Sequence, residues 1–129
     1  MGLATNLERP SVLLIDDEAL VRRVFMRMIR TADVDAVGTA EEALERLEET
    51  TYDAILCDLS LPGLSADKFY EHLVREGRGL HKRFAVVTGG ATSTEHEKFL
   101  VNSKVPVVLK PTSPDTLNGL IEDLVRSAE

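Results

Sequence analysis

Acidic side chains follow two of the apolar segments in this chain. Asp16 and Asp17 come directly after the run VLLI, and Asp58 comes directly after the run AILC. Carboxylates repel one another and resist burial, so three of them near one place need a compensating positive charge. Carboxylate oxygens are the ligands that Mg²⁺ prefers in proteins. The three acids therefore indicate a divalent cation site, if the fold brings them together.

A hydroxyl and an amine follow two further apolar runs. Thr88 ends the run FAVVT, and Lys110 comes directly after the run VPVVL. A carboxylate nucleophile, a magnesium ion and a lysine are the groups that transfer of a phosphoryl group to an aspartate uses. The residue types thus favour phosphoryl chemistry, with the acids holding the metal that accompanies the phosphate.

The elements that must position these groups can be predicted from the apolar pattern. Five apolar runs alternate with segments whose apolar residues recur with a helical period. The runs cover residues 12–15, 34–37, 54–57, 84–87 and 105–109. The helices are expected over about 20–29, 40–47, 66–76, 94–101 and 117–125, and the pattern is weakest for 94–101. This alternation is typical of a parallel sheet with helices on both faces.

Two of the predicted strands have residues that suit the edge of a sheet. Asp35 lies within the second run, and Pro106, which has no backbone N–H to donate, lies within the fifth. With right-handed connections, edge strands two and five favour a doubly wound, flavodoxin-like (βα)5 sandwich of three layers, with the strand order 2-1-3-4-5. In that order ligands bind at the carboxyl ends of strands 1 and 3, where the acids lie.

Length and composition limit the possible classes of protein. The chain has 129 residues, which suits one domain, and we expect a flexible lead-in over residues 1–10 before a single domain over 11–129. The net charge of −7 opposes direct binding to nucleic acid. The sequence has no apolar run of about 18 residues and no signal peptide, and Cys57 is its only cysteine. We expect a cytoplasmic protein with no direct membrane contact and no output domain after Glu129.

Four short motifs resemble the receiver domain of bacterial response regulators. They are IDDE after the first run, DLSLPG after the third, TGG after the fourth and KP after the fifth. The resemblance covers about residues 11–127 and implies a (βα)5 domain that takes a phosphoryl group from a histidine kinase onto an aspartate. The stretch TGGATSTEHEKFL is also similar to receivers fused to hybrid histidine kinases.

The resemblance implies a role for each acidic residue. Asp58 matches the phosphoacceptor and is also a ligand of Mg²⁺. Asp17 matches the direct metal ligand, whereas Asp16 matches the acid that reaches the metal through water. Ser60, two residues after the acceptor, would offer its backbone carbonyl to the metal.

The resemblance also implies the groups that would contact the phosphoryl group. Thr88 matches the hydroxyl that bonds a phosphoryl oxygen, and Lys110 matches the lysine that pairs with it. The Lys110–Pro111 bond resembles the usual cis peptide of the family. Val107 stands where the family often has the aromatic residue of its switch, so we expect a different route from the phosphate to the output surface.

The first predicted helix suggests a surface for a partner. Arg22, Arg23 and Phe25 lie on it together with further arginines, and this is either a solvated basic face or a docking surface for a histidine kinase or a histidine phosphotransfer domain. We expect the unphosphorylated protein to be a monomer.

Two other functions remain open. The first is a pseudo-receiver, an interaction module that never takes phosphate. The second is a phosphatase of the haloacid-dehalogenase type, whose Asp-x-Asp motif would begin at Asp16 but has Glu18 in its second place. The leading prediction is a receiver that catalyses its own phosphorylation and is not a turnover enzyme.

Overall fold

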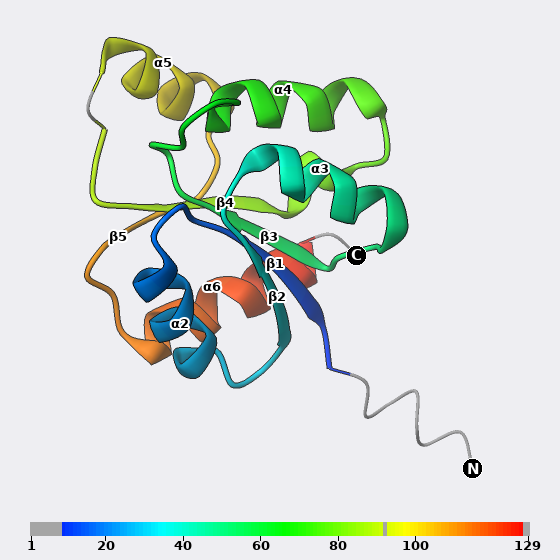
Figure 1. Cartoon of the computed structure of the whole chain (residues 1–129), viewed down its shortest axis with the longest axis vertical. Coiled ribbons are helices and arrows are strands. Elements are labelled where there is room, and N and C mark those ends of the chain that lie inside the picture. Colours follow the sequence, from blue (N-terminus) through cyan, green and yellow to red (C-terminus); the bar gives the residue numbers. More distant parts are fainter. Residues whose placement is uncertain (1–8, 92, 128–129) are drawn as a thin grey trace.

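The fold is a parallel sheet of five strands between two layers of helices (Figure 1). The computed structural model describes residues 9–91 and 93–127, so most of the expected lead-in lies outside the described residues. The strands are Ser11–Ile15 (β1), Asp33–Val37 (β2), Ala54–Cys57 (β3), Phe84–Thr88 (β4) and Val107–Leu109 (β5). Their order is β2-β1-β3-β4-β5, which confirms the predicted topology and the two predicted edge strands.

The helices divide between the two faces of the sheet. They are Ala19–Met28 (α2), Ala40–Glu49 (α3), Ala66–Glu76 (α4), Thr94–Ser103 (α5) and Pro114–Ser127 (α6), with a short 3₁₀ helix at Leu80–Arg83 (η1). Figure 1 shows α3, α4 and α5 on one side of the sheet, with α2 and α6 on the other. In the described residues no helix is long and apolar enough to cross a membrane.

Each face of the sheet has its own apolar core, because successive side chains of a strand point to opposite faces. In β1, Leu13 and Ile15 belong to the core beneath α3 and α4, whereas Val12 and Leu14 belong to the core beneath α2 and α6. Every residue of β3 and β4 is buried. The central strands are therefore fixed from both sides, which holds their carboxyl ends in place.

Two elements begin two or more residues away from their predicted starts. The last strand begins at Val107 and not at residue 105, because Pro106 lacks the N–H that a strand residue donates. The last helix begins at Pro114, three residues before the first expected position. Ser113 caps this helix by accepting the backbone N–H of Thr116 at 3.1 Å, and proline suits a first helical position.

Helix α5 is the least anchored helix of the described chain. It has no fully buried residue, whereas α3 and α4 each bury three. Phe99 and Leu100 are only half-buried where they pack on the core beneath α3 and α4. The side chain of Ser93 caps the start of the helix by accepting the backbone N–H of His96 at 3.1 Å. The stability of α5 therefore rests on one N-terminal cap and on the packing of a few half-buried side chains.

Candidate functional site

The site lies at the carboxyl ends of β1 and β3, which are neighbours in the sheet. Ile15 and Cys57 are paired in the register of these strands, so the residues that follow them, Asp16 and Asp58, lie side by side. The backbone N–H of Asp58 donates to the carbonyl of Ile15 at 2.9 Å, which continues the ladder to the site. Both side chains are buried, with 1% of Asp16 and 7% of Asp58 exposed.

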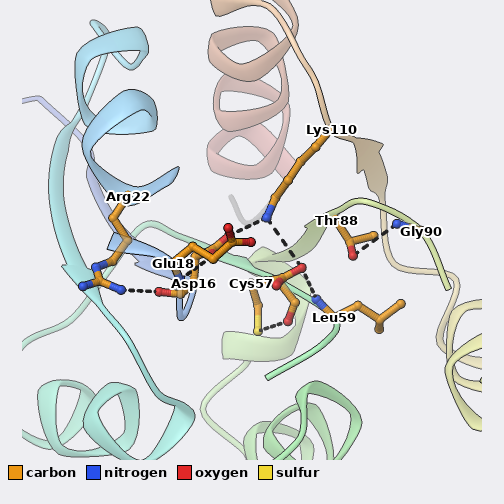
Figure 2. Close-up of polar contacts among 9 residues, drawn as sticks. Asp16, Glu18, Arg22, Cys57, Leu59, Thr88, Gly90 and Lys110 are labelled. Atoms are coloured by element: carbon orange, nitrogen blue, oxygen red, sulfur yellow. Dashed lines mark hydrogen bonds and ion pairs between the residues drawn. The ribbon is translucent and has the colours of Figure 1, made fainter. Parts of the chain in front are cut away.

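Lys110 brings an ammonium group between these two carboxylates (Figure 2). Its Nζ lies 2.5 Å from Oδ2 of Asp16 and 3.7 Å from Oδ1 of Asp58. The backbone N–H of Lys110 donates to the carbonyl of Thr88 at 2.8 Å, and the Lys110–Pro111 peptide bond is cis. The lysine therefore compensates the charge of Asp16 more closely than the charge of Asp58.

The Asp16 carboxylate is engaged at both oxygens, and the next two acids are exposed. Oδ1 of Asp16 accepts the backbone N–H of Glu18 at 2.9 Å, while Oδ2 pairs with Lys110. Asp17 and Glu18 are exposed, and together with Asp16 they offer carboxylate oxygens that lie within 4.8 Å of one another. This donor set suits a hard divalent cation. The sequence did not predict Glu18 as a metal ligand, but the hydrogen bond from its backbone N–H to Asp16 holds it beside the two aspartates.

The surroundings of Asp58 shift its protonation equilibrium. Burial raises the pKa of this carboxyl above its ordinary value of 3.8, Lys110 opposes the rise, and the Asp16 carboxylate adds to it. The Asp58 side chain accepts the backbone N–H of Leu59 at 2.9 Å, which favours the ionised form. Asp58 is thus a buried carboxylate whose charge is only partly compensated.

Cys57 lies next to the phosphoacceptor candidate and is fully buried. Burial raises the pKa of its thiol well above the ordinary value, and the carboxylates of Asp58 and Asp16 add to the rise. A thiol without thiolate character is a poor nucleophile. Cys57 therefore acts as a small apolar group of the core in β3.

The remaining predicted site residues lie around the two buried aspartates or on the neighbouring strands. Thr88 ends β4 beside β5, its side chain is buried, and its hydroxyl accepts the backbone N–H of Gly90 at 3.4 Å. Ser60 is exposed in the turn after Asp58. Val107 lies in β5, and 40% of it is exposed.

The structure corrects the docking surface that the sequence suggested on α2. Phe25 is only 5% exposed because it faces the core beneath α2 and α6, and its ring lies 6.0 Å from Nζ of Lys110. Phe25 is therefore not part of a surface that a partner could reach. The exposed large apolar residues of this helix are Leu20, Val24 and Met26, and the first two border a shallow pocket with Arg23.

Arg22 lies closer to the acidic site than the sequence suggested. Its guanidinium donates to the backbone carbonyl of Asp16 at 2.6 Å (Figure 2). The bond ties the first turns of α2 to the acidic loop. The spacing of six residues after Asp16 could have indicated this contact, because the second turn of a helix places a long side chain within reach of the loop before it.

The family comparison and the curated relatives point to one and the same protein family. Residues 12–122 match the family model described as the response regulator receiver domain. The two-component response regulator PhoP of Pseudomonas aeruginosa is 34% identical over 119 residues, which cover 89% of this chain and 51% of that protein. The nitrate/nitrite response regulator protein homolog of Haemophilus influenzae is 29% identical over 126 residues, which cover 95% of this chain and 58% of that protein. The chain thus spans about half the length of these curated relatives.

Solved structures agree with this family. The signal receiver domain of an HD domain-containing protein from Pseudomonas fluorescens superposes with a TM-score of 0.82 at 14% identity, covering 94% of this chain and 98% of that one. A sensor protein from Polaromonas superposes with a TM-score of 0.77 at 25% identity, covering 94% of this chain and 99% of that one. The first likeness supports the fold alone.

Proposed function

Because the chain belongs to the response-regulator receiver family, we propose that it accepts a phosphoryl group on Asp58 with the help of Mg²⁺ and signals by a change in conformation. The observation that supports this most is the meeting of two buried carboxylates and one lysine at the ends of neighbouring strands. Such a group of like charges with one cation suits a site where a metal and a phosphate complete the charge balance.

The acids divide into two roles toward Mg²⁺. Asp17 would bind the ion directly, because it is exposed and no hydrogen bond to its carboxylate is present among the described residues. Asp16 would act through water, since both of its oxygens already have partners. Asp58 and the backbone carbonyl of Ser60 would complete the protein ligands. When bound, the ion would neutralise the charge on the phosphoryl oxygens.

The side chains around Asp58 then have distinct tasks. A carboxylate oxygen of Asp58 attacks the phosphorus of a phosphohistidine, the P–N bond breaks, and the histidine of the donor takes up a proton. Lys110 lies 3.7 Å from Asp58, so a short movement of its Nζ would reach a phosphoryl oxygen. The Thr88 hydroxyl, which ends the next strand, would donate to another of these oxygens. The chain would thus catalyse its own phosphorylation without turning over a substrate.

The donor would be a histidine kinase or a histidine phosphotransfer domain. We propose that it docks on α2 at Arg23, where Leu20 and Val24 give an exposed apolar surface beside the acidic site. The chain would work as one receiver domain over residues 11–129 in the cytoplasm, without direct contact to a membrane or to nucleic acid. The relative PhoP suggests that the domain would belong to a response regulator, whereas the resemblance of the stretch TGGATSTEHEKFL to receivers of hybrid kinases suggests a second setting.

Intact mass spectrometry tests the proposal. Incubation with acetyl phosphate and Mg²⁺ should give one phosphoryl adduct per chain, and removal of Mg²⁺ with a chelator should abolish it. The variant Asp58→Asn should give no adduct, while Asp53→Asn, which changes an acid before β3, should label normally. A protein that never labels would be a pseudo-receiver. Steady release of phosphate from small phosphoesters would indicate a phosphatase.

A further inference from the structure

A groove runs between α4 and α5, which lie side by side in the upper part of Figure 1. Its volume is about 390 Å³, and both helices supply its lining. Nothing in the proposed phosphorylation uses this groove, because the acidic site lies beside α2, at the ends of β1 and β3.

Aromatic rings form the apolar part of the groove. The rings of Tyr70 on α4 and Phe99 on α5 meet edge to face, with their centroids 5.4 Å apart. Tyr70 also packs on Phe84 of β4 at 5.2 Å, which anchors the pair to the core. Both rings are only half-buried, so part of each remains open to a ligand.

Acidic side chains border these rings. Asp67, Glu71 and Glu95 line the groove from its two sides, and Lys98 is the one cation in its lining. Three carboxylates and one ammonium group leave two negative charges. Glu71 has a salt bridge with Lys68 at 3.9 Å, but both side chains are more than half exposed, so that pair is weak and easily exchanged.

This combination suits a cation attached to an apolar chain. Aromatic faces attract an arginine or lysine cation that lies over them, and the planar guanidinium of arginine also stacks on a ring. The surrounding carboxylates repel anions, so neither an acidic peptide nor nucleic acid fits the same place.

We propose that the groove between α4 and α5 docks a basic segment of a partner protein. An arginine or lysine of that segment lies over the rings of Tyr70 and Phe99, and its charge is balanced by Asp67, Glu71 and Glu95. The aliphatic part of the same segment covers the exposed ring edges. This interaction surface goes beyond the proposed phosphorylation and does not depend on it, so it can be tested on the unphosphorylated protein.

A peptide titration followed by amide NMR tests the proposal. The probe is a short blocked peptide of alternating arginine and leucine, and the matched probe has citrulline, which is uncharged, in place of each arginine. The arginine peptide should shift the amides of residues 67–71 and 95–103. The citrulline peptide should bind about fivefold more weakly or worse, as expected for the loss of one partly exposed ion pair.

Two variants with the same change of charge separate this groove from a general attraction to an acidic protein. The first variant is Glu71→Lys, which changes a residue of α4 in the groove lining. The second is Glu45→Lys, which changes an exposed residue of α3 outside that lining. Glu71→Lys should weaken binding about fivefold or more, and Glu45→Lys less than about twofold. Shifts spread equally over α3 and the groove, equal losses in both variants, or undiminished binding of the citrulline peptide would overturn the proposal.

Discussion

Asp16 and Asp58 share one ammonium group, and they share it unequally. Lys110 lies 2.5 Å from Asp16 but 3.7 Å from Asp58, although both carboxylates are buried. The ionised form of Asp58 is therefore the less compensated of the two. Burial raises the pKa of Asp58, and Lys110 at 3.7 Å offsets only part of that rise.

The first prediction is that Asp58→Asn stabilises the metal-free protein at neutral pH. The pKa of Asp58 is raised in the folded state above 3.8, so the folded protein binds the proton more tightly than the unfolded chain. Ionisation therefore costs stability at pH values above the folded pKa, and the cost disappears as the pH falls through that pKa toward 3.8. Urea unfolding should show a higher free energy of unfolding for the variant at neutral pH, and a difference that vanishes as the pH approaches 3.8. A loss of stability at neutral pH would contradict this account of Asp58.

The second prediction separates the two neighbouring aspartates. Asp17→Asn should weaken Mg²⁺ binding by roughly tenfold or more, and Asp16→Asn should weaken it less. Both carboxylate oxygens of Asp16 already have partners in the described residues, whereas those of Asp17 have none there. Amide NMR of the site during a magnesium titration would give both affinities. Equal affinities in the two variants would show that the proposed division of roles is wrong.

At the scale of elements, the sequence predicted the strands and their order more securely than the directions of side chains. The apolar runs fix the central strands, because residues buried on both faces must be apolar throughout. The predicted helix over 66–76 agrees with α4. The helix over 94–101, which had the weakest apolar pattern in the sequence, corresponds to α5, which has no fully buried residue. The 3₁₀ helix η1 was not predicted, since four residues are too few for a periodic pattern.

The functional residues were harder to place where a helix was involved. Phe25 and Arg22 both lie on α2, but one turns into the core and the other turns back to the carbonyl of Asp16. The direction of a helical side chain depends on how the helix is rotated against the sheet, which the sequence specifies only approximately. Residues at strand ends, such as Asp58 and Lys110, could be placed because a parallel sheet brings all its carboxyl ends to one edge.

The third prediction concerns the response of α5. Beryllofluoride, a mimic of the phosphoryl group, should slow hydrogen exchange at Gly89, Gly90 and residues 93–101 and leave β5 almost unchanged. Thr88 leads directly into this segment, and α5 is weakly anchored, so a new bond at Thr88 can order it. Val107 is already 40% exposed and is stiff at χ1, so it cannot move between buried and exposed states as a large ring would.

Protection confined to β5 and α6 would contradict this route. Asp58→Asn with beryllofluoride is the matched control, because it removes the carboxylate to which the mimic binds while leaving α5 unaltered. That variant should show no change in exchange at any of these residues.

At the scale of the whole molecule, the proposed metal site joins elements that belong to both cores. β1 and β3 supply residues to the core on each face of the sheet, and their ends hold Asp16 and Asp58. A ligand that binds these ends only in the folded state stabilises the whole fold by mass action. Because the net charge is −7, part of this gain is a general reduction of repulsion, which any salt would also provide.

The fourth prediction is that Mg²⁺ raises the melting temperature of the wild-type protein at constant ionic strength. A concentration of about ten times the dissociation constant should add about 1.4 kcal/mol to the free energy of unfolding. Sodium chloride at the same ionic strength controls for screening. Asp17→Asn should lose most of the magnesium effect, and an equal shift in that variant would show that the ion does not act at the proposed site.

Localisation of the phosphoryl group tests the central claim most directly. An acyl phosphate on an aspartate is reduced by borohydride to homoserine, so treatment of the labelled protein followed by peptide mass spectrometry identifies the residue that held the phosphate. We predict homoserine at position 58 alone, only when acetyl phosphate and Mg²⁺ are both present. Homoserine at position 16 or 17 under the same conditions, or its absence from position 58 in protein that shows a phosphoryl adduct by intact mass, would contradict the assignment of Asp58 as the phosphoacceptor.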